Sequence, residues 1–402
     1  MLRALELTNF KCFAQQRIEL GAVTLLAGQN GMGKSTVLQS LLLIQQSDAL
    51  TRAIAMAVEQ DEENAKGFIS RKDAPMELRG GPPLVLNGQY VSSGTSRDLL
   101  CESANRDTVA IKVQWVDRDD GEGNLVPSVI DMTFDASGHD RDTMTLGETT
   151  FYGPDLGIPF RGRARYLAAE RIGPRMSHAV SAYHVDDLDA VGHDGAYAVA
   201  FLESHAGDEV EVALRRHDAP AITLAEQVSA WMTEISPGIR LHTQQVPEVN
   251  AAALSVSFTS GVAASRRFRP TSVGFGISYT LPVVVTLLAA RPGTLLLIEN
   301  PEAHLHPRGQ MALGELIARA GAAGIQVIVE THSDHVVNGV RLAVKDKKIA
   351  ADQVKFNYFT RRDEGDRLVH EVVSPRIDAD GRLDQWPDGF FDQWDLALER
   401  LI

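Results

Sequence analysis

The chain has 402 residues, which is enough for one large domain with a sizeable insertion or for two modest domains. Its composition, 44% hydrophobic and 23% charged, is ordinary for a soluble globular protein with a core of its own. The formal charge of −14 opposes broad contact with the phosphates of nucleic acids. A protein that binds DNA by itself is therefore not favoured.

No stretch of the sequence indicates secretion or membrane insertion. Residues 1–11 mix charged and polar residues among apolar ones and lack the apolar core of a secretory signal. Residues 281–290 are the longest largely apolar stretch and fall short of the ~18 residues that a membrane span needs. Cys12 and Cys101 make no metal-ligand spacing. We expect a cytoplasmic protein in a reducing compartment.

The first fifty residues predict a strand, a turn, a strand, a loop and a helix. Apolar positions in residues 2–7 and alternation at 18–20 indicate two extended segments. Residues 23–27 are apolar apart from Thr24, as expected of a strand that is buried on both faces. A Leu-rich helix is predicted from about residue 34 to residue 46.

The loop between that strand and that helix carries a phosphate-binding motif. Residues 28–35, GQNGMGKS, fit the pattern G-x-x-x-x-G-K-[ST]. Its glycines allow backbone N–H groups to surround phosphate oxygens, and the helix adds its positive N-terminal end. Lys34 should reach the β- and γ-phosphates, and the Ser35 hydroxyl should bind Mg²⁺. The motif therefore predicts an ATP and Mg²⁺ site.

The rest of the chain predicts strands in the middle and an α/β order at the end. In the middle, the pattern predicts strands at 111–115, 129–134 and 165–169, and helical spacing at 212–235 with an interruption near Pro220. Towards the end, it predicts helices at 282–290 and 310–320 and buried strands at 294–298 and 325–329. Strands that alternate with helices imply a mostly parallel, doubly wound sheet. No heptad run encodes a long coiled coil.

Two of the late strands end in polar residues that suit ATP hydrolysis. Glu299 follows an apolar run and would hold Mg²⁺ through water, as the Walker-B acid does. His332 follows another buried strand and could sense the γ-phosphate. We expect Lys34, Glu299 and His332 to surround one triphosphate. The alternative is a metal site that uses His335 with Asp334, or His304 and His306, but the sequence identifies no further convergent ligand.

Glycines also precede the predicted helix that starts at Pro282. Residues 272–278, SVGFGIS, would form a second anion-binding helix end. Just before them, Arg266, Arg267 and Arg269 flank Phe268 and could contact DNA or nucleotide, although such a cluster is more often only solvated.

In this order, the four motifs resemble the ABC-type ATPases of the RecF/SMC/OLD branch. Residues 9–13, NFKCF, look like its N-F-K-x-F strand end, which touches the nucleotide. Residues 298–307, IENPEAHLHP, are similar to its E-x-P-E-x-H-L-H-P box, and residues 330–334, ETHSD, to its His switch. Residues 381–394 are similar to a C-terminal segment of unknown function on some bacterial AAA-type ATPases.

The resemblance implies an α/β P-loop NTPase fold. Its ABC-ATPase head would carry a doubly wound, mostly parallel sheet, an added antiparallel β lobe and a helical insertion, without a long coiled coil. The domains expected are residues 1–50 and 261–375 for the two parts of the head, 51–260 for the β lobe and helical insertion, and 376–402 for the tail.

The resemblance also implies a site and a partner. Two heads would form a homodimer, with each ATP between one phosphate loop and the other copy's signature loop, residues 272–278. The residues expected to act in catalysis are Glu299, Asn300, Glu302 and His332, with Ser35 and Glu299 on Mg²⁺. The residues expected to bind nucleotide are Lys11, Asn30, Gly31, Met32, Gly33, Lys34, Ser35, Thr36, Ser272, Gly274 and Gly276.

This chain departs from the branch at two positions. Asn300 stands where the branch often has Glu beside the Walker-B acid, and an amide cannot accept a proton from the attacking water. Either Glu302 is the base, or hydrolysis is slow and ATP mainly holds the dimer together. Val273 replaces a usual glycine or serine in the signature loop, which leaves Ser272 or Ser278 as the donor.

These features predict an ATPase that acts as a nucleotide-driven switch on a protein effector. A role in bacterial defence against phage rests on the family resemblance alone. The chain ends soon after the predicted head, so we expect no C-terminal nuclease domain like that of OLD proteins. The alternatives are a RecF-like DNA-repair ATPase that binds duplex DNA, and a non-hydrolysing scaffold.

Overall fold

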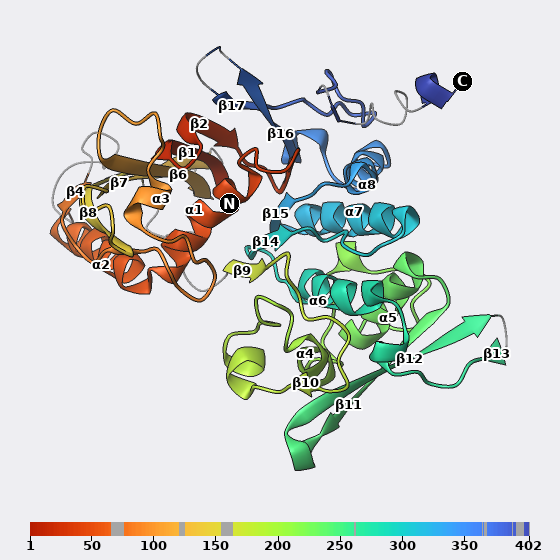
Figure 1. The fold of residues 1–402 in the computed structure, drawn as a ribbon. Coiled ribbons are helices and arrows are strands. Elements are labelled where there is room, and N and C mark those ends of the chain that lie inside the picture. Colours follow the sequence, from red (N-terminus) through yellow and green to blue (C-terminus); the bar gives the residue numbers. More distant parts are fainter. Residues whose placement is uncertain are drawn as a thin grey trace. The chain divides into compact units, whose positions relative to one another are not determined.

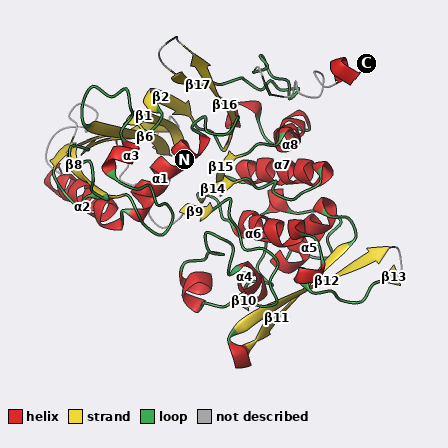
Figure 2. Ribbon diagram, viewed as in Figure 1, coloured by secondary structure: helices red, strands yellow, loops and turns green. Residues whose placement is uncertain are grey.

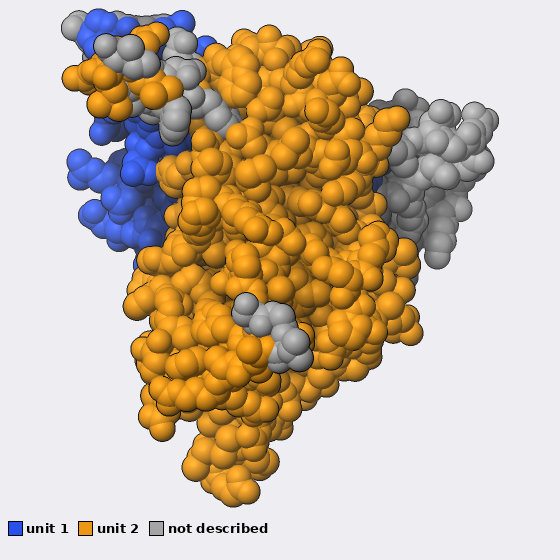
Figure 3. All heavy atoms as spheres, turned by 90° about the vertical axis from the view of Figure 1, so that its right-hand side faces the viewer, with its two compact units in different colours: residues 1–21, 28–164, 357–374 blue, residues 22–27, 165–356, 375–402 orange. Residues whose placement is uncertain are grey.

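The computed structural model consists of two compact units, each made from several chain segments. Unit 1 contains residues 1–21, 28–164 and 357–374, and unit 2 contains residues 22–27, 165–356 and 375–402; Figure 3 colours the two units. The structure describes residues 1–65, 76–119, 125–153, 164–260, 263–363, 365, 368–387, 389–390 and 398–401. Part of the predicted tail segment, including Asp392 and Trp394, lies outside these residues.

Unit 1 is built on an antiparallel sheet, which Figure 1 shows behind helix α1. The sheet order is β2-β1-β6-β7-β8-β4, and β5 also pairs with β8. The strands are β1 Leu2–Phe10, β2 Phe13–Glu19, β4 Met76–Arg79, β5 Leu84–Val85, β6 Thr108–Asp119, β7 Leu125–Asp135 and β8 Thr143–Tyr152. Alternating apolar residues bury one face of these strands, and Trp115 and Phe134 are fully buried. The predicted antiparallel β lobe is confirmed.

Three helices and a hairpin complete unit 1. Helix α1 covers Lys34–Gln46, the range predicted from the sequence, and buries its Leu-rich face. The other elements are helices α2 Asp48–Ala65 and α3 Ser96–Leu99, and the hairpin of β16 Val354–Asp363 with β17 Leu368–Val373, of which β16 belongs to unit 1 from Asn357 onwards. Within the described residues, α2 is the longest helix, at 18 residues, so no long coiled coil is present there.

Unit 2 contains the mostly parallel sheet that the sequence predicted. Strands β3 Val23–Gly28, β15 Gln326–Glu330 and β14 Leu295–Glu299 lie side by side and parallel, and β9 Ala164–Leu167 borders β14. Almost every residue of the three central strands is buried, which explains their continuous apolar runs. The predicted α/β class is confirmed.

The helices of unit 2 pack beside one another, as Figure 2 shows in red. They are α4 Ala198–Ser204, α5 Leu224–Ile235, α6 Phe275–Ala289, α7 Pro307–Ala322 and α8 Asp334–Lys345. Helix α6 contacts α5 and α7, and α7 contacts α8. A smaller antiparallel sheet joins β10 His178–Ala179, β12 Ala251–Ser260 and β11 Ile239–Val246, and β13 Ala263–Ala264 pairs with β12. Among the described residues, no helix has both the length and the apolar character that crossing a bilayer requires.

Two predicted helices have different bounds in the structure. Helix α6 begins at Phe275, so Pro282 lies in its interior and not in its first turn. The ring of Pro282 packs against Gly195, where an added Cβ would lie 2.5 Å from the ring. The helical spacing at 212–235 gives an α-helix only from Leu224, because residues 212–214 form a single 3₁₀ turn and Pro220 lies in the loop that follows.

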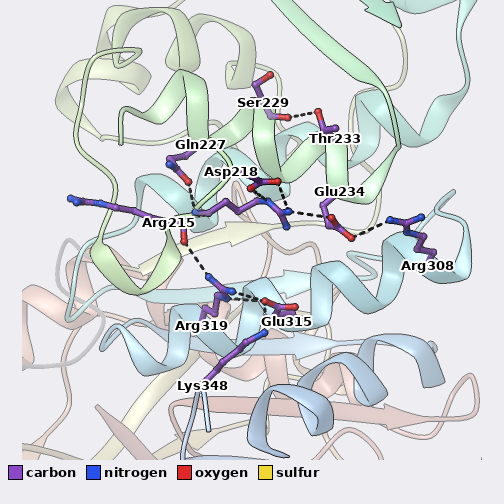
Figure 4. Close-up of polar contacts among 11 residues, drawn as sticks. Arg215, Asp218, Gln227, Ser229, Thr233, Glu234, Arg308, Glu315, Arg319 and Lys348 are labelled. Carbon is purple, nitrogen blue, oxygen red and sulfur yellow. Dashed lines mark hydrogen bonds and ion pairs between the residues drawn. The ribbon is translucent and has the colours of Figure 1, made fainter. Parts of the chain in front are cut away.

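A buried tryptophan of α5 packs against neighbouring elements of unit 2. The Trp231 ring lies between the guanidinium groups of Arg216 and Arg319, each 5.3 Å from the ring centre. Its indole N–H donates to the Leu214 carbonyl at 2.8 Å. Figure 4 draws ion pairs of the neighbouring residues, which include Arg308–Glu234, Arg319–Glu315 and Lys348–Glu315. These contacts join α5, α7 and the loop before α5.

Candidate active site

The phosphate loop folds around the ammonium group of Lys34. This side chain is 3% exposed, and its Nζ donates to the Gly28 carbonyl at 3.0 Å and to the Gln29 carbonyl at 2.6 Å. Gly33 precedes α1 with a φ of 102°, and no side chain caps the first turn of the helix. Helix N-termini of this kind are common anion-binding sites.

Glycine is required at two of the three loop positions for steric reasons. A Cβ on Gly33 would lie 2.6 Å from the ring of Phe13 and 2.8 Å from the Cys12 sulfur. A Cβ on Gly28 would lie 2.2 Å from the Phe359 carbonyl oxygen. At Gly31 an added Cβ meets nothing within 4 Å, although its φ is 76°. The loop is therefore packed tightly at both ends and exposed at Gly31.

The predicted nucleotide contact Lys11 lies in the turn between β1 and β2. Its φ is 51°, and its Nζ donates to Oε1 of Gln39 on α1 at 2.6 Å. Burial lowers the pKa of Lys11. Unit 1 thus brings Lys11 to the helix that follows the phosphate loop. The other predicted residues of this loop are the exposed Asn30, the buried Met32 and Thr36, and the half-buried Ser35.

In unit 2, three parallel strands end in register at one edge of the sheet. Leu26 of β3 is paired with Glu330 of β15, and Glu330 is paired with Glu299 of β14. The phosphate loop begins at Gly28, two residues after Leu26. In sheets of this type, ligands bind at the carboxyl ends of the strands.

The carboxylate of Glu299 is oriented by a segment that the motifs did not point to. Its Oε1 accepts a hydrogen bond from the Tyr166 hydroxyl at 3.0 Å, and its Oε2 accepts one from the Ala169 N–H at 3.2 Å. Burial, and then the charge of Glu299, raise the pKa of Tyr166, so the hydroxyl stays protonated and donates. The sequence predicted a strand at 165–169 but gave no signal of this role.

Glu302 and His332 lie together beyond the ends of β14 and β15. Oε1 of Glu302 accepts a hydrogen bond from the His332 backbone N–H at 2.8 Å. Oε2 of Glu302 is buried and has no hydrogen-bond partner among the described residues. Burial raises the pKa of Glu302. A carboxylate with one occupied and one open oxygen and a raised pKa is suited to accept a proton.

The backbone conformation of Asn300 accounts for the residue type at this position. Its φ is 43°, in the left-handed region, where Asn is tolerated better than most residues and others cost roughly 1 kcal/mol. Its N–H donates to the Glu330 carbonyl at 2.8 Å. Its side-chain oxygen is buried and lacks a partner within the described part of the chain. A glutamate here would have to adopt an unfavourable backbone conformation.

The predicted signature loop is largely exposed. Ser272 and Gly274 are exposed, and α6 begins directly after Gly274. Ser278 is only 5% exposed because it lies in the second turn of α6. Of the two serines considered as donors, Ser272 is therefore the accessible one.

The histidines considered as metal ligands are dispersed. His335 is 3.6 Å from Asp334, its neighbour in sequence. His304 packs its ring against Tyr279, and His306 accepts from the Arg308 N–H at the start of α7. Across the described ranges, no group of three or more His, Cys, Asp or Glu side chains is arranged to hold a metal ion.

Three protein-family models match the chain. A model for an AAA ATPase domain matches residues 1–78. A model described as an AAA domain, putative AbiEii toxin, Type IV TA system, matches residues 200–338, and one for a protein of unknown function (DUF3696) matches residues 349–401. These matches confirm the resemblance inferred from the motifs. The chain is therefore similar to AAA ATPase domains over residues 1–78 and 200–338, and to a segment of unknown function over residues 349–401.

Solved structures of SMC heads are among those similar to this chain. A SmcHead bound to the C-winged helix domain of ScpA is 13% identical, with 94% of this chain and 98% of that chain covered and a TM-score of 0.44. The SMC head domain from Thermotoga maritima is 13% identical (92% and 98% covered, TM-score 0.39). An Smc head from Pyrococcus furiosus, bound to the C-terminal domain of ScpA, is 14% identical (100% and 99% covered, TM-score 0.46). No curated protein matches the sequence.

The residues present fit Mg-ATP. The exposed Gly31 and the start of α1, where no side chain caps the helix, suit phosphate oxygens. Mg²⁺ prefers oxygen ligands and usually keeps several waters beside one or two carboxylates and the phosphates. A hydroxyl at Ser35 and a carboxylate at Glu299 are ligands of this kind, and each oxygen of Glu299 retains acceptor capacity beyond its one hydrogen bond.

Proposed function

We propose that this ATPase closes into a homodimer on Mg-ATP and acts as a nucleotide-driven switch on a protein effector. The observation that carries the proposal is the register at the sheet edge of unit 2, where Leu26, Glu330 and Glu299 are neighbours. Because the phosphate loop follows Leu26 in the chain, the proposal assigns one nucleotide to the loop and to the carboxylates that follow β14.

In this proposal, the residues of unit 1 bind the phosphates. Lys34 exchanges its hydrogen bonds to the loop carbonyls for bonds to the β- and γ-phosphates, and Ser35 binds the metal ion. Lys11 adds positive charge from the β1–β2 turn. Bound Mg²⁺ would neutralise phosphate charge and hold the γ-phosphate for attack. Glu299 would hold the ion through water, and Tyr166 would fix the direction of that carboxylate.

Glu302 is the proposed general base. Its open Oε2 and its raised pKa suit removal of a proton from the attacking water. The amide of Asn300 cannot do this, and His332 would sense the γ-phosphate from the tip of β15. Hydrolysis would then reopen the dimer.

The dimer contact is proposed to be the signature loop, with Ser272, Gly274 and Gly276 against the nucleotide of the other copy. The exposure of the loop and the start of α6 directly after it support this assignment. The effector and the role in defence are supported only by the description of the family model over residues 200–338, a putative AbiEii toxin of a type IV system.

Turnover measurements test the proposed chemistry. Glu302→Gln should lower kcat by about 100-fold or more and leave Mg-ATP binding in place, because a general base contributes about 10²–10⁴-fold. Asn300→Glu should not raise turnover, because its backbone is left-handed. Brisk turnover by Glu302→Gln would show that Glu302 is not the base. If the wild type binds ATP but does not hydrolyse it, the alternative of a non-hydrolysing scaffold is favoured.

Sedimentation with Mg-ATP tests the dimer. Glu302→Gln should accumulate as a dimer, because this variant binds ATP but does not hydrolyse it, and the proposal has hydrolysis reopen the dimer. Gly274→Arg, added to Glu302→Gln, should prevent the dimer. The fold should tolerate this substitution, since a Cβ at Gly274 meets nothing within 4 Å. If the double variant dimerises as well as Glu302→Gln alone, the signature loop is not the contact.

A DNA-binding ATPase is the second candidate, and the arginine cluster supports it. Arg266, Arg267 and Arg269 are exposed, and Arg266 lies 4.9 Å from the ring centre of Phe268. Duplex DNA should then bind only with ATP, and its affinity should fall steeply as salt rises. Replacing the three arginines by alanine should abolish that binding.

A further inference from the structure

The guanidinium of Arg171 joins three segments of unit 2 through hydrogen bonds to their backbone carbonyls. The side chain is 3% exposed. Its Nη1 donates to Ala168 and to Glu299, and its Nη2 donates to Asn300, each at 2.7 Å. Its Nε donates to Tyr279 of α6 at 3.1 Å. One side chain therefore links the end of β9, the helix after the signature loop and the turn after the Walker-B strand.

Only arginine can make this set of bonds. A guanidinium presents five N–H donors in a rigid, planar fork, whereas the ammonium of lysine is a compact group with three donors. The ring of Tyr279 also lies 5.6 Å from the guanidinium carbon, which adds a cation–π contact. The buried charge is balanced by carbonyl oxygens and by the neighbouring Glu302 and Glu299.

The turn held by Arg171 carries the residues that the proposed chemistry uses. Asn300, whose carbonyl accepts from Arg171, has the left-handed φ of 43°. Two residues later, Glu302 bonds the backbone of His332. A change in the direction of the 299 and 300 carbonyls would therefore move the Glu302 carboxylate relative to the tip of β15.

The start of α6 is in close contact with the same turn. A Cβ on Gly276 would lie 2.7 Å from the His304 carbonyl oxygen, so the two backbones touch. The rings of Phe275, Tyr279 and His304 pack on one another, with centres 4.7 to 6.2 Å apart. Movement of α6 along this contact would reach the turn, and Arg171 is the polar link between them.

We propose that Arg171 is a positioning residue that couples the signature helix α6 to the turn carrying Asn300 and Glu302. Contact of the signature loop with the nucleotide of a second copy would fix the position of α6. Through its hydrogen bonds, Arg171 would then fix the position of the turn and of the Glu302 carboxylate. Hydrolysis would then require the closed dimer. This inference rests on the function proposed above.

The test compares Arg171→Lys with Arg165→Lys. Arg165 is on β9, the strand that precedes Arg171 in the chain, and it is also largely buried and pairs with Asp189, but within the described residues it makes no hydrogen bond to the 299–302 turn. Arg171→Lys should lower kcat by about 100-fold, the size expected when positioning is lost, and change the Kd for Mg-ATP by less than about 3-fold. Arg165→Lys should change neither. Equal kcat values in the two variants, or equal losses of kcat and ATP affinity, would overturn the inference.

Hydrogen exchange on the wild type gives a second test that needs no variant. On adding Mg²⁺ and a non-hydrolysable ATP analogue, residues 275–289 and 299–304 should gain protection together. Protection of one segment without the other would contradict the coupling. If the wild type neither binds nor hydrolyses Mg-ATP, the proposed function itself fails and this inference fails with it. If the wild type turns over and Arg171→Lys does too, only the role of Arg171 is lost.

Discussion

The phosphate loop and the Walker-B turn are built in opposite ways. The ammonium group in the loop is held by sequence neighbours, since Lys34 bonds carbonyls five and six residues away, and only the packing on the end glycines comes from farther along the chain. The turn is formed by distant segments, since Tyr166 bonds Glu299 across 133 residues and Arg171 bonds Tyr279 across 108. A short motif therefore describes the first region almost completely and describes only half of the second.

Because of this difference, we expect substitutions in the two regions to affect different properties of the protein. Substitutions in the loop should act directly on phosphate binding and on local packing. Substitutions in the segment 165–171 should leave binding in place and act on the direction of carboxylates. The predictions below test that separation.

The largest effect is expected from Lys34→Ala. Loss of the ammonium removes the main cation for the phosphates, so Mg-ATP affinity should fall by about 100-fold or more. Titration with a fluorescent ATP analogue measures this. Lys112→Ala is the control, because Lys112 is a partly exposed lysine on β6 whose partner is Glu6. If Lys34→Ala binds Mg-ATP as tightly as the wild type, the phosphate loop is not part of the nucleotide site.

A pair of glycine variants tests the packing of the loop. Gly33→Ala should destabilise the protein by about 2–3 kcal/mol, because it adds strain at a φ of 102° to contacts of 2.6 and 2.8 Å. Gly31→Ala should cost only about 1 kcal/mol, since its Cβ meets no atom within 4 Å. Urea unfolding compares the two. Equal losses would show that steric contact does not decide the residue type.

Tyr166→Phe tests the distant half of the site. Loss of the hydroxyl that orients Glu299 should raise the Mg²⁺ concentration for half-maximal turnover by about tenfold, as for other partners that orient a metal-binding residue. Tyr183→Phe is the matched control because Tyr183 is 60% exposed and its ring packs on His184. An unchanged Mg²⁺ requirement would mean that Tyr166 has no part in metal binding.

The smallest change is expected in the pH dependence of turnover. The base must be ionised, and burial raises the pKa of Glu302, so the fall of kcat with decreasing pH should begin above the ordinary Glu value of about 4.3. The residual turnover of Glu302→Gln should lack this acid limb. If both proteins lose activity over the same pH range, another group titrates.

Much of the sheet and the phosphate loop could be predicted from the sequence, because these elements leave local patterns. The helix at 34–46 was predicted to the residue, and the strands ending near Glu299 and Glu330 to within one residue. The start of α6 was wrong, since Pro282 was taken for a helix beginning. Tyr166 and Arg171 could not be found, because bonds across more than 100 residues leave no spacing to recognise. The roles of the individual site residues remain predictions.

The tryptophan between Arg216 and Arg319 has a practical consequence for folding experiments. Among the described residues, Trp231 is the buried indole of unit 2 and Trp115 is the buried indole of unit 1, while Trp386 is half exposed. Two adjacent cations should shift the emission of Trp231 relative to that of Trp115. Denaturation followed at two wavelengths would then report whether the two halves of this chain melt together or one after the other.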